Sequence, residues 1–186
     1  MRQTQLAGLG AQAEILIRPI TLEDAGAFLA LGKRLDEETQ FMMLEPDERQ
    51  LTLEDQQERI TAWLDDIRSG VFVAAALDKL VGFIALQGGA YRRNQHCAYI
   101  VVGVRQAFAG QGIGTRLFAA GEHWAREHHM HRLDLTVMVH NTRAISLYQK
   151  LGFAIEGTRK HSLQVNDRYV DEYAMAKLLD EWKSSS

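Results

Sequence analysis

Residues Val104–Leu117, VRQAFAGQGIGTRL, join an apolar segment to an amphipathic one through glycines at Gly110, Gly112 and Gly114. Glycine lets the backbone turn at positive φ and approach a ligand without a Cβ in the way. The helix expected to follow directs unpaired N–H groups and the positive end of its dipole at the same place. The stretch therefore predicts an anion site suited to phosphate, with a tight strand-to-helix turn without ligand as the alternative.

The spacing of the glycines excludes two other phosphate-binding loops. A dinucleotide fingerprint needs Gly-x-Gly-x-x-Gly, but its last position falls on Thr115 or Leu117. A P-loop needs Gly-Lys-Ser/Thr after four spacer residues, and no such lysine is present.

A second motif lies in Val139–Phe153, VHNTRAISLYQKLGF. Asn141 can cap a helix that begins after the preceding strand. Spacings of three and four place four residues on one face of that helix: Ala144, Leu147, Tyr148 and Leu151. Tyr148 is either a core residue of this face or part of a site, and the motif alone leaves both open.

Strand and helix patterns alternate along the chain. Strands are expected at Glu14–Ile20, Val71–Leu77, Leu80–Leu86, His96–Val104, Arg132–Val139, Phe153–Leu163 and Arg168–Leu178. Helices are expected from Leu22 to Leu35, at Leu53–Arg68 ended by Gly70, from Ile113 with a face of Ile113, Leu117, Ala120 and Trp124, and at Thr142–Gly152. This order predicts a three-layer α/β fold, with a mixed central β-sheet and helices on both faces.

Composition limits the class of protein. The 186 residues are 46% hydrophobic and 24% charged with a net charge of −3, which indicates a globular protein without a basic surface for nucleic acid. No apolar run is long enough to span a membrane, and the lone Cys97 excludes an internal disulfide, so we expect a cytoplasmic protein. Residues 1–13 are expected to form a flexible leader, and residues 14–186 a single domain.

The order strand, GQGIG, helix, strand and then N-x-x-A-x-x-L-Y-x-x-L-G-F resembles the GNAT superfamily of N-acetyltransferases over about Val71–Leu178. The tail from Glu156 to Leu179 loosely resembles the branch with bacterial amino-acid and ribosomal-protein N-acetyltransferases. The resemblance implies a GNAT-like fold and an enzyme that moves an acetyl group from acetyl-CoA to a primary amine, without a metal. The amine attacks the thioester directly, on a small molecule or a peptide.

The resemblance also assigns roles to residues. Backbone N–H groups of the loop that binds the CoA pyrophosphate correspond to Gly110, Gln111, Gly112, Ile113, Gly114 and Thr115. The strand backbone that holds the pantetheine arm and the acetyl carbonyl corresponds to Val102, Gly103 and Val104. Asn141 matches a cofactor-contacting residue, and Tyr148 matches the tyrosine near the sulfur, whose hydroxyl can protonate the departing thiolate.

Two positions depart from the family pattern. Ala109 replaces an arginine or glutamine that contacts the phosphates, so we expect weaker cofactor binding, with Arg105 and Arg116 as nearby positive charges or as plain surface residues. Tyr99 stands where many relatives carry a carboxylate that acts as general base. Candidate replacements are His96, Glu37, Glu38 and Glu45.

The remaining features carry weaker predictions. Residues Phe41, Met42 and Met43 fall where the family builds its acceptor pocket. A histidine-rich stretch, His123–His131, lacks the spacing of a zinc site. Cys97 lies in an apolar strand and is predicted to be an inert core thiol. The final hairpin could support a homodimer. A catalytically silent acyl-CoA sensor is the competing function.

Overall fold

The computed structural model describes residues 14–77 and 79–179, so the predicted leader at 1–13 lies outside the described residues. The elements follow in the predicted order. Their bounds are β1 Ile15–Pro19, α1 Ala25–Glu38 after a 3-10 turn at Leu22–Asp24, α2 Leu53–Asp65, β2 Ser69–Ala76, β3 Lys79–Gly88, β4 Cys97–Val104, a 3-10 turn at Gln106–Phe108, α3 Ile113–Glu127, β5 Arg132–Met138, α4 Thr142–Lys150, β6 Ala154–Val165 and β7 Arg168–Leu178.

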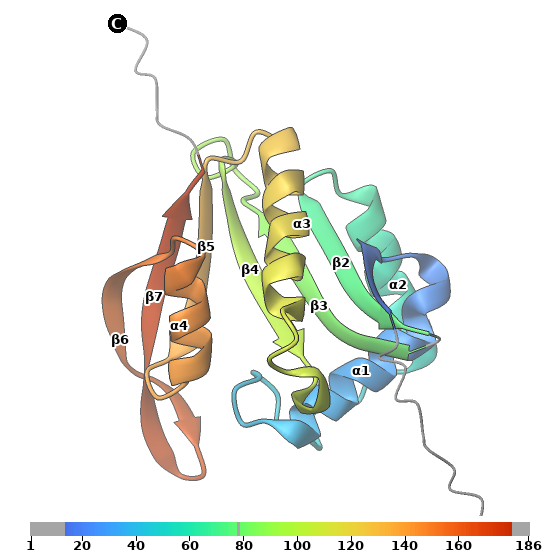
Figure 1. Ribbon diagram of the computed structural model, residues 1–186, viewed down its shortest axis with the longest axis horizontal. Coiled ribbons are helices and arrows are strands. Elements are labelled where there is room, and N and C mark those ends of the chain that lie inside the picture. Colours follow the sequence, from blue (N-terminus) through green and yellow to red (C-terminus); the bar gives the residue numbers. More distant parts are fainter. Residues whose placement is uncertain (1–13, 78, 180–186) are drawn as a thin grey trace, which may run out of the picture.

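The strands form one sheet in the order β1-β2-β3-β4-β5-β7-β6. The neighbours β4 and β5 are parallel, and all other neighbouring pairs are antiparallel. Helices α3 and α4 cover one face of the sheet, and α1 and α2 cover the other (Figure 1). The predicted three-layer fold with a mixed central sheet is confirmed.

The two parallel strands separate after a short paired stretch. Residues Cys97–Tyr99 of β4 pair with residues Arg132–Asp134 of β5, and beyond them each strand is paired in the described chain only with its other neighbour. The strands diverge toward the end of the sheet where α3 and α4 begin (Figure 1). Both helices begin there because each follows a parallel strand, whose carboxyl ends share one edge of the sheet.

Each face of the sheet has its own hydrophobic core. Side chains of β3, β4, β5 and β7 pack beneath α3 and α4, with Ile84, Leu117 and Leu133 fully buried. On the other face, Leu35 of α1 and Ile60 of α2 pack on β2 and β3. The second core stops at β3, so the face of β4 that carries Tyr99 and Val101 is left 43% exposed at each residue.

Local sequence signals explain several element ends. The Thr52 hydroxyl accepts the N–H of Asp55 while the Asp55 carboxylate accepts the N–H of Thr52, which forms the predicted capping box of α2. Asn166 and Asp167 both have positive φ, as a tight two-residue hairpin turn between β6 and β7 requires.

The predicted end of α2 was wrong. The helix ends at Asp65 rather than Arg68, and Gly70 lies inside β2. A Cβ at Gly70 would come within 2.6 Å of the Trp124 ring of α3. Glycine is therefore present at this position because a helix packs closely on the strand, not because a helix ends there.

The buried face predicted for α3 was half right. Ile113 and Leu117 are buried as expected, but the face continues through Phe118, Gly121 and Ala125. Ala120 and Trp124 are only partly buried. Gly121 fits here because a Cβ would already meet Leu86 of β3 at 3.0 Å, so α3 lies close to the sheet.

Candidate functional site

The glycine loop leaves the start of α3 open. Gly110 and Gly112 have φ of 83° and 75°, the left-handed region in which glycine avoids strain. Gly112 occupies the N-cap position and so supplies no side-chain cap, whereas α2 and α4 are capped by Thr52 and Asn141. Among the described residues, the first N–H groups of α3 thus have no helical or side-chain acceptor, and a Cβ at Gly112 would meet nothing within 4 Å. This geometry fits an anionic group.

Helix α4 packs directly beside this loop. A Cβ at Gly114 would lie 3.0 Å from the Leu147 side chain, so the glycine permits the close approach. The Arg143 Nη2 atom lies 3.6 Å from the Cβ position of Gly110. Asn141 uses its side-chain oxygen to accept the N–H of Ala144 at 3.2 Å, which leaves its amide NH₂ group for another partner. The two motifs that lie far apart in the sequence are therefore adjacent.

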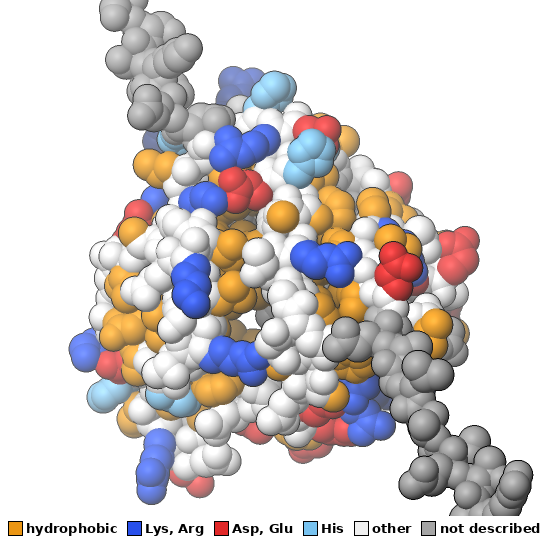
Figure 2. Space-filling view, in the orientation of Figure 1, with side chains coloured by type: hydrophobic (Ala, Val, Ile, Leu, Met, Phe, Trp, Pro, Cys, Tyr) orange, Lys and Arg blue, Asp and Glu red, His pale blue; other side chains and the backbone are white. Residues whose placement is uncertain are grey.

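The surface is hollowed where these elements meet. Figure 2 shows this hollow between α3 and α4, with hydrophobic side chains on its floor and a basic side chain on its rim. Val102 and Val104 of β4 pack against the core on this face, and Gly103 lies against Leu35 on the other. Because β5 has separated here, the backbone of these three residues is paired on the β3 side alone.

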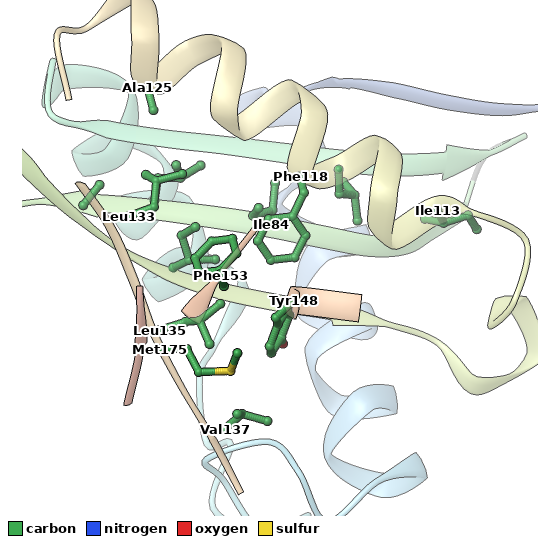
Figure 3. Packing of buried hydrophobic residues seen from close by; sticks show 14 of the residues in the cluster. Ile84, Ile113, Phe118, Ala125, Leu133, Leu135, Val137, Tyr148, Phe153 and Met175 are labelled. Atoms are coloured by element: carbon green, nitrogen blue, oxygen red, sulfur yellow. The ribbon is translucent and has the colours of Figure 1, made fainter. Parts of the chain in front are cut away.

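Tyr148 points from α4 into the core beside the separated strands. Its ring packs edge-on against Phe118 at 5.5 Å between centroids and lies beside Phe153 (Figure 3). Burial, with a smaller contribution from Tyr99, raises the pKa of the Tyr148 hydroxyl to about 12. The hydroxyl is thus a neutral proton donor at physiological pH.

Tyr99 lies across the sheet from Tyr148. Its hydroxyl shares a hydrogen bond of 2.9 Å with the Thr136 hydroxyl of β5, at the point where the strands begin to diverge. Tyr99 therefore occupies the expected base position with a phenol bound to a second hydroxyl.

The flanking charges have structural partners. Arg105 donates to Glu38 Oε1 from Nη2 at 2.7 Å, and the N–H of Gln106 donates to Oε2 at 2.9 Å. These bonds, led by the one from Arg105, lower the pKa of Glu38 and make it a poor base. Arg116 donates to the carbonyl oxygen of Ile15 at 2.7 Å. Neither arginine is directed at the glycine loop as a free charge.

The other candidate bases lie outside β4 and β5. His96 precedes β4, three residues before Tyr99, on the paired side of the point where the strands separate. Glu37 is exposed and paired with Arg34. Glu45 is also exposed, and its backbone N–H donates to Glu48.

The segment between α1 and α2 reaches over the open end of the sheet. The Phe41 ring lies 5.3 Å from the ring of His140, which follows β5. Met42 contacts the Gly103 region, and Met43 is 72% exposed. A shallow polar hollow on the outside of this segment is separate from the glycine loop; its walls are Lys33, Glu37, Pro46, Asp47, Arg49, Gln50 and Leu51.

The histidine-rich stretch is dispersed. His128 stacks on Trp124 at 4.3 Å, and His123 pairs with Glu127 on the helix surface. Within residues 14–77 and 79–179, no three His, Cys, Asp or Glu side chains come together as metal ligands would. Burial raises the pKa of the Cys97 thiol, which disfavours the reactive thiolate. In the same ranges, no helix is long and apolar enough to cross a bilayer.

Known proteins identify the class to which this arrangement belongs. A family model described as the acetyltransferase (GNAT) family matches residues 35–153. The chain therefore belongs to the GNAT family and is an acetyltransferase, and the resemblance noted in the sequence is confirmed.

Individual relatives agree with this assignment. The L-amino acid N-acetyltransferase AaaT of Escherichia coli (strain K12) is 33% identical over 110 residues, which span 57% of this chain and 66% of AaaT. The structure of a GNAT acetyltransferase from Streptococcus pneumoniae is 28% identical with a TM-score of 0.85, and it covers 89% of this chain and 99% of that one. The structure of yncA from Salmonella typhimurium, which contains acetyl-CoA, has the same fold with 18% identity and a TM-score of 0.81. The match covers 92% of this chain and 98% of yncA.

Arg143 is the residue at this site that sequence reasoning missed. It lies in the first turn of α4, where a positive charge is unfavourable beside the helix dipole. A basic residue at such a position is a signal in the sequence for a nearby anion. The structure brings it to the loop in which Ala109 lacks a charge.

Proposed function

We propose that this chain transfers the acetyl group of acetyl-CoA to a primary amine, at the place where β4 and β5 separate. The proposal depends on the fact that three features lie together there. They are the uncapped start of α3, the unpaired edge of β4 and the buried hydroxyl of Tyr148. Acetyl-CoA, when bound, supplies an activated acetyl group on a thiol leaving group. The residues around it supply binding, orientation and a proton.

The glycine loop and strand β4 are proposed to bind acetyl-CoA through backbone groups. The N–H groups of the loop are proposed to hold the pyrophosphate; the loop residues are Gly110, Gln111, Gly112, Ile113, Gly114 and Thr115. The free backbone edge of Val102, Gly103 and Val104 is proposed to hold the pantetheine arm. An N–H from this edge directed at the acetyl oxygen would stabilise developing negative charge by a few kcal/mol. The free NH₂ group of Asn141 and the guanidinium of Arg143 complete the binding surface.

Tyr148 is the proposed general acid. Its hydroxyl stays protonated at neutral pH because burial raises its pKa to about 12. Full transfer of this proton to a free thiolate, whose thiol has a pKa of about 8.5, is unfavourable, so the hydroxyl is proposed to donate a hydrogen bond to the sulfur as the C–S bond breaks, and the proton released by the attacking amine completes the thiol. The hydroxyl lies on the α4 side of the separated strands, where the leaving sulfur is expected. The acceptor amine is proposed to enter from the opposite face, past Tyr99 and Thr136.

The acceptor is proposed to be a small-molecule or peptide amine. AaaT, by its name, acts on L-amino acids, which makes a free α-amino group the first candidate. The chain's net charge of −3 is compatible with a cationic acceptor.

Thiol release from acetyl-CoA, measured over a panel of amino acids, amino-acid amides, alkylamines, polyamines and short peptides, tests the proposal. We expect turnover of at least one amine, and a loss of about tenfold or more in kcat for Tyr148→Phe with the Kd of acetyl-CoA unchanged. Full activity of Tyr148→Phe would remove the proposed acid. Acetyl-CoA binding without acetylation of any amine would favour the sensor, which family membership does not favour.

A further inference from the structure

Glu172 is a buried carboxylate on β7 to which the reaction above gives no role. Its side chain is 7% exposed, and it pairs with Arg159 of β6, whose side chain is 58% exposed. The Oε2 atom of Glu172 and the Nη1 atom of Arg159 are 3.5 Å apart. This distance is longer than that of a charged hydrogen bond, which is about 2.7–2.9 Å. A buried carboxylate is costly unless a cation compensates it closely. Glu172 is therefore only partly compensated.

The sheet register places Glu172 on the face of the sheet opposite α3 and α4, from which the acceptor is proposed to enter; we call this the acceptor face. Glu172 is opposite Met138 of β5, and Ala174 is opposite Thr136. Opposed residues share a face of a sheet, and alternate residues of a strand return to that face. Thr136 bonds to Tyr99 on the face opposite α4, so Glu172 lies on this same face.

Glu172 is also close to the place where the strands separate. From Thr136, its backbone lies two residues along the strand, about 7 Å, and one strand across, about 4.8 Å. A glutamate side chain covers part of this distance. The contact between Phe41 and His140 lies at the same end of β5. Glu172 thus lies within a small molecule's length of the separated strands.

We propose that Glu172 binds the ammonium group of the acceptor and so selects cationic amines. This inference rests on the proposed function, because it assigns a substrate class to that site. A primary amine with a pKa near 10 is cationic at neutral pH. Its ammonium group is small enough to approach the carboxylate more closely than Arg159 does, and it replaces that partner. Glu172 acts in binding only: the bound ammonium loses one proton to solvent water before the neutral amine attacks the thioester.

The first test separates KM from kcat. For the best amine of the panel, we expect Glu172→Gln to raise KM about tenfold or more, with kcat and the KM of acetyl-CoA nearly unchanged. Glu172→Asp keeps the charge on a shorter side chain and should recover part of the affinity. An unchanged amine KM in Glu172→Gln would overturn the proposal.

Arg159→Gln is the matched variant, because it removes the other half of the ion pair. If Arg159 competes with the acceptor for Glu172, this variant lowers the amine KM. If the pair only holds β6 to β7, both variants lower the melting temperature alike and change the amine KM alike. Opposite signs support acceptor binding, and equal signs overturn it.

A binding measurement keeps this inference separate from the activity. Saturation-transfer NMR in the presence of CoA compares each amine of the panel with its neutral alcohol analogue. We expect wild type to bind an amine in preference to its alcohol, and Glu172→Gln to lose the preference. Absence of any preference in the wild type overturns the inference even if turnover is seen, whereas preference without turnover counts against the proposed reaction alone.

Discussion

Tyr148 combines a core position with a proposed chemical role. Its ring packs with Phe118 and Phe153, and the same burial that stabilises the fold raises the pKa of its hydroxyl. The sequence left two interpretations of this residue, core or site. The structure shows that Tyr148 is buried, and the proposed chemistry depends on that burial.

The raised pKa predicts how the protein responds to alkaline pH. With a folded value of about 12 and an unfolded value of about 10, the unfolded state loses this proton first. The contribution of neutral Tyr148 to stability is therefore complete below about pH 10 and is lost between about pH 10 and 12. Ultraviolet titration of wild type against Tyr148→Phe should show that the missing phenol does not ionise below about pH 11. A phenol that titrates at or below its ordinary value would contradict the burial of the Tyr148 hydroxyl.

At the scale of elements, the glycine loop and the start of α4 lie side by side, and we propose that they bind one anion together. In this proposal the loop supplies N–H groups, and Arg143 supplies the charge that Ala109 lacks. The two flanking arginines that the sequence suggested for this purpose, Arg105 and Arg116, have partners elsewhere.

Arg143→Gln should raise the Kd of acetyl-CoA about tenfold and reduce its dependence on salt, because a charged hydrogen bond to phosphate contributes about 1.5 kcal/mol or more. Ala109→Arg should tighten binding modestly and recover part of the loss in the Arg143→Gln background. Arg116→Gln is the control, since its guanidinium contacts Ile15, and it should leave the Kd nearly unchanged. Calorimetric titration measures the wild type and the four variants. Equal losses from the two arginine variants would place the phosphates elsewhere.

At the scale of the whole molecule, the segment between α1 and α2 is held over the sheet by a buried ion pair. The Asp36 side chain is fully buried, and its carboxylate accepts from Arg49 Nη2 at 3.0 Å and from Nε at 2.5 Å. This pair fixes the segment that carries Phe41 and Met42 to the face of the sheet from which the acceptor is proposed to enter.

Asp36→Asn should lower the free energy of unfolding by about 3 kcal/mol, because it leaves the mostly buried Arg49 charge uncompensated. The exposed pair of Arg34 and Glu37 supplies the control, and Glu37→Gln should cost less than about 0.5 kcal/mol. Denaturant unfolding measures both. In Asp36→Asn the KM of the amine should rise more than that of acetyl-CoA, since the segment lies on the acceptor side. Equal stability losses would contradict this role of the pair.

The sheet edge bears on the prediction of a homodimer. Strand β6 ends the sheet, and most of its residues are exposed, so its outer backbone edge is unpaired in the described chain. The homodimer stays a prediction, and sedimentation of the full chain tests it.

The order of elements, the mixed sheet and the family were all predictable from the sequence. These properties depend on local signals: hydrophobic periodicity, the capping box at Thr52, the turn at Asn166 and Asp167, and glycines at fixed spacing. Each of them acts within a few residues of the chain, where the sequence alone determines which backbone conformations are favourable.

The tertiary structure alone decided which distant side chains meet. Arg105 pairs with Glu38 across 67 positions, and Tyr99 bonds to Thr136 across 37. Gly70 is a glycine because Trp124 packs on it, and the approach of Arg143 to Gly110 depends on the packing of α4 beside α3. No local pattern encodes such contacts, because they depend on how the helices pack on the sheet. Sequence thus determined the candidate residues, and packing determined which of their side chains already have partners in the described chain.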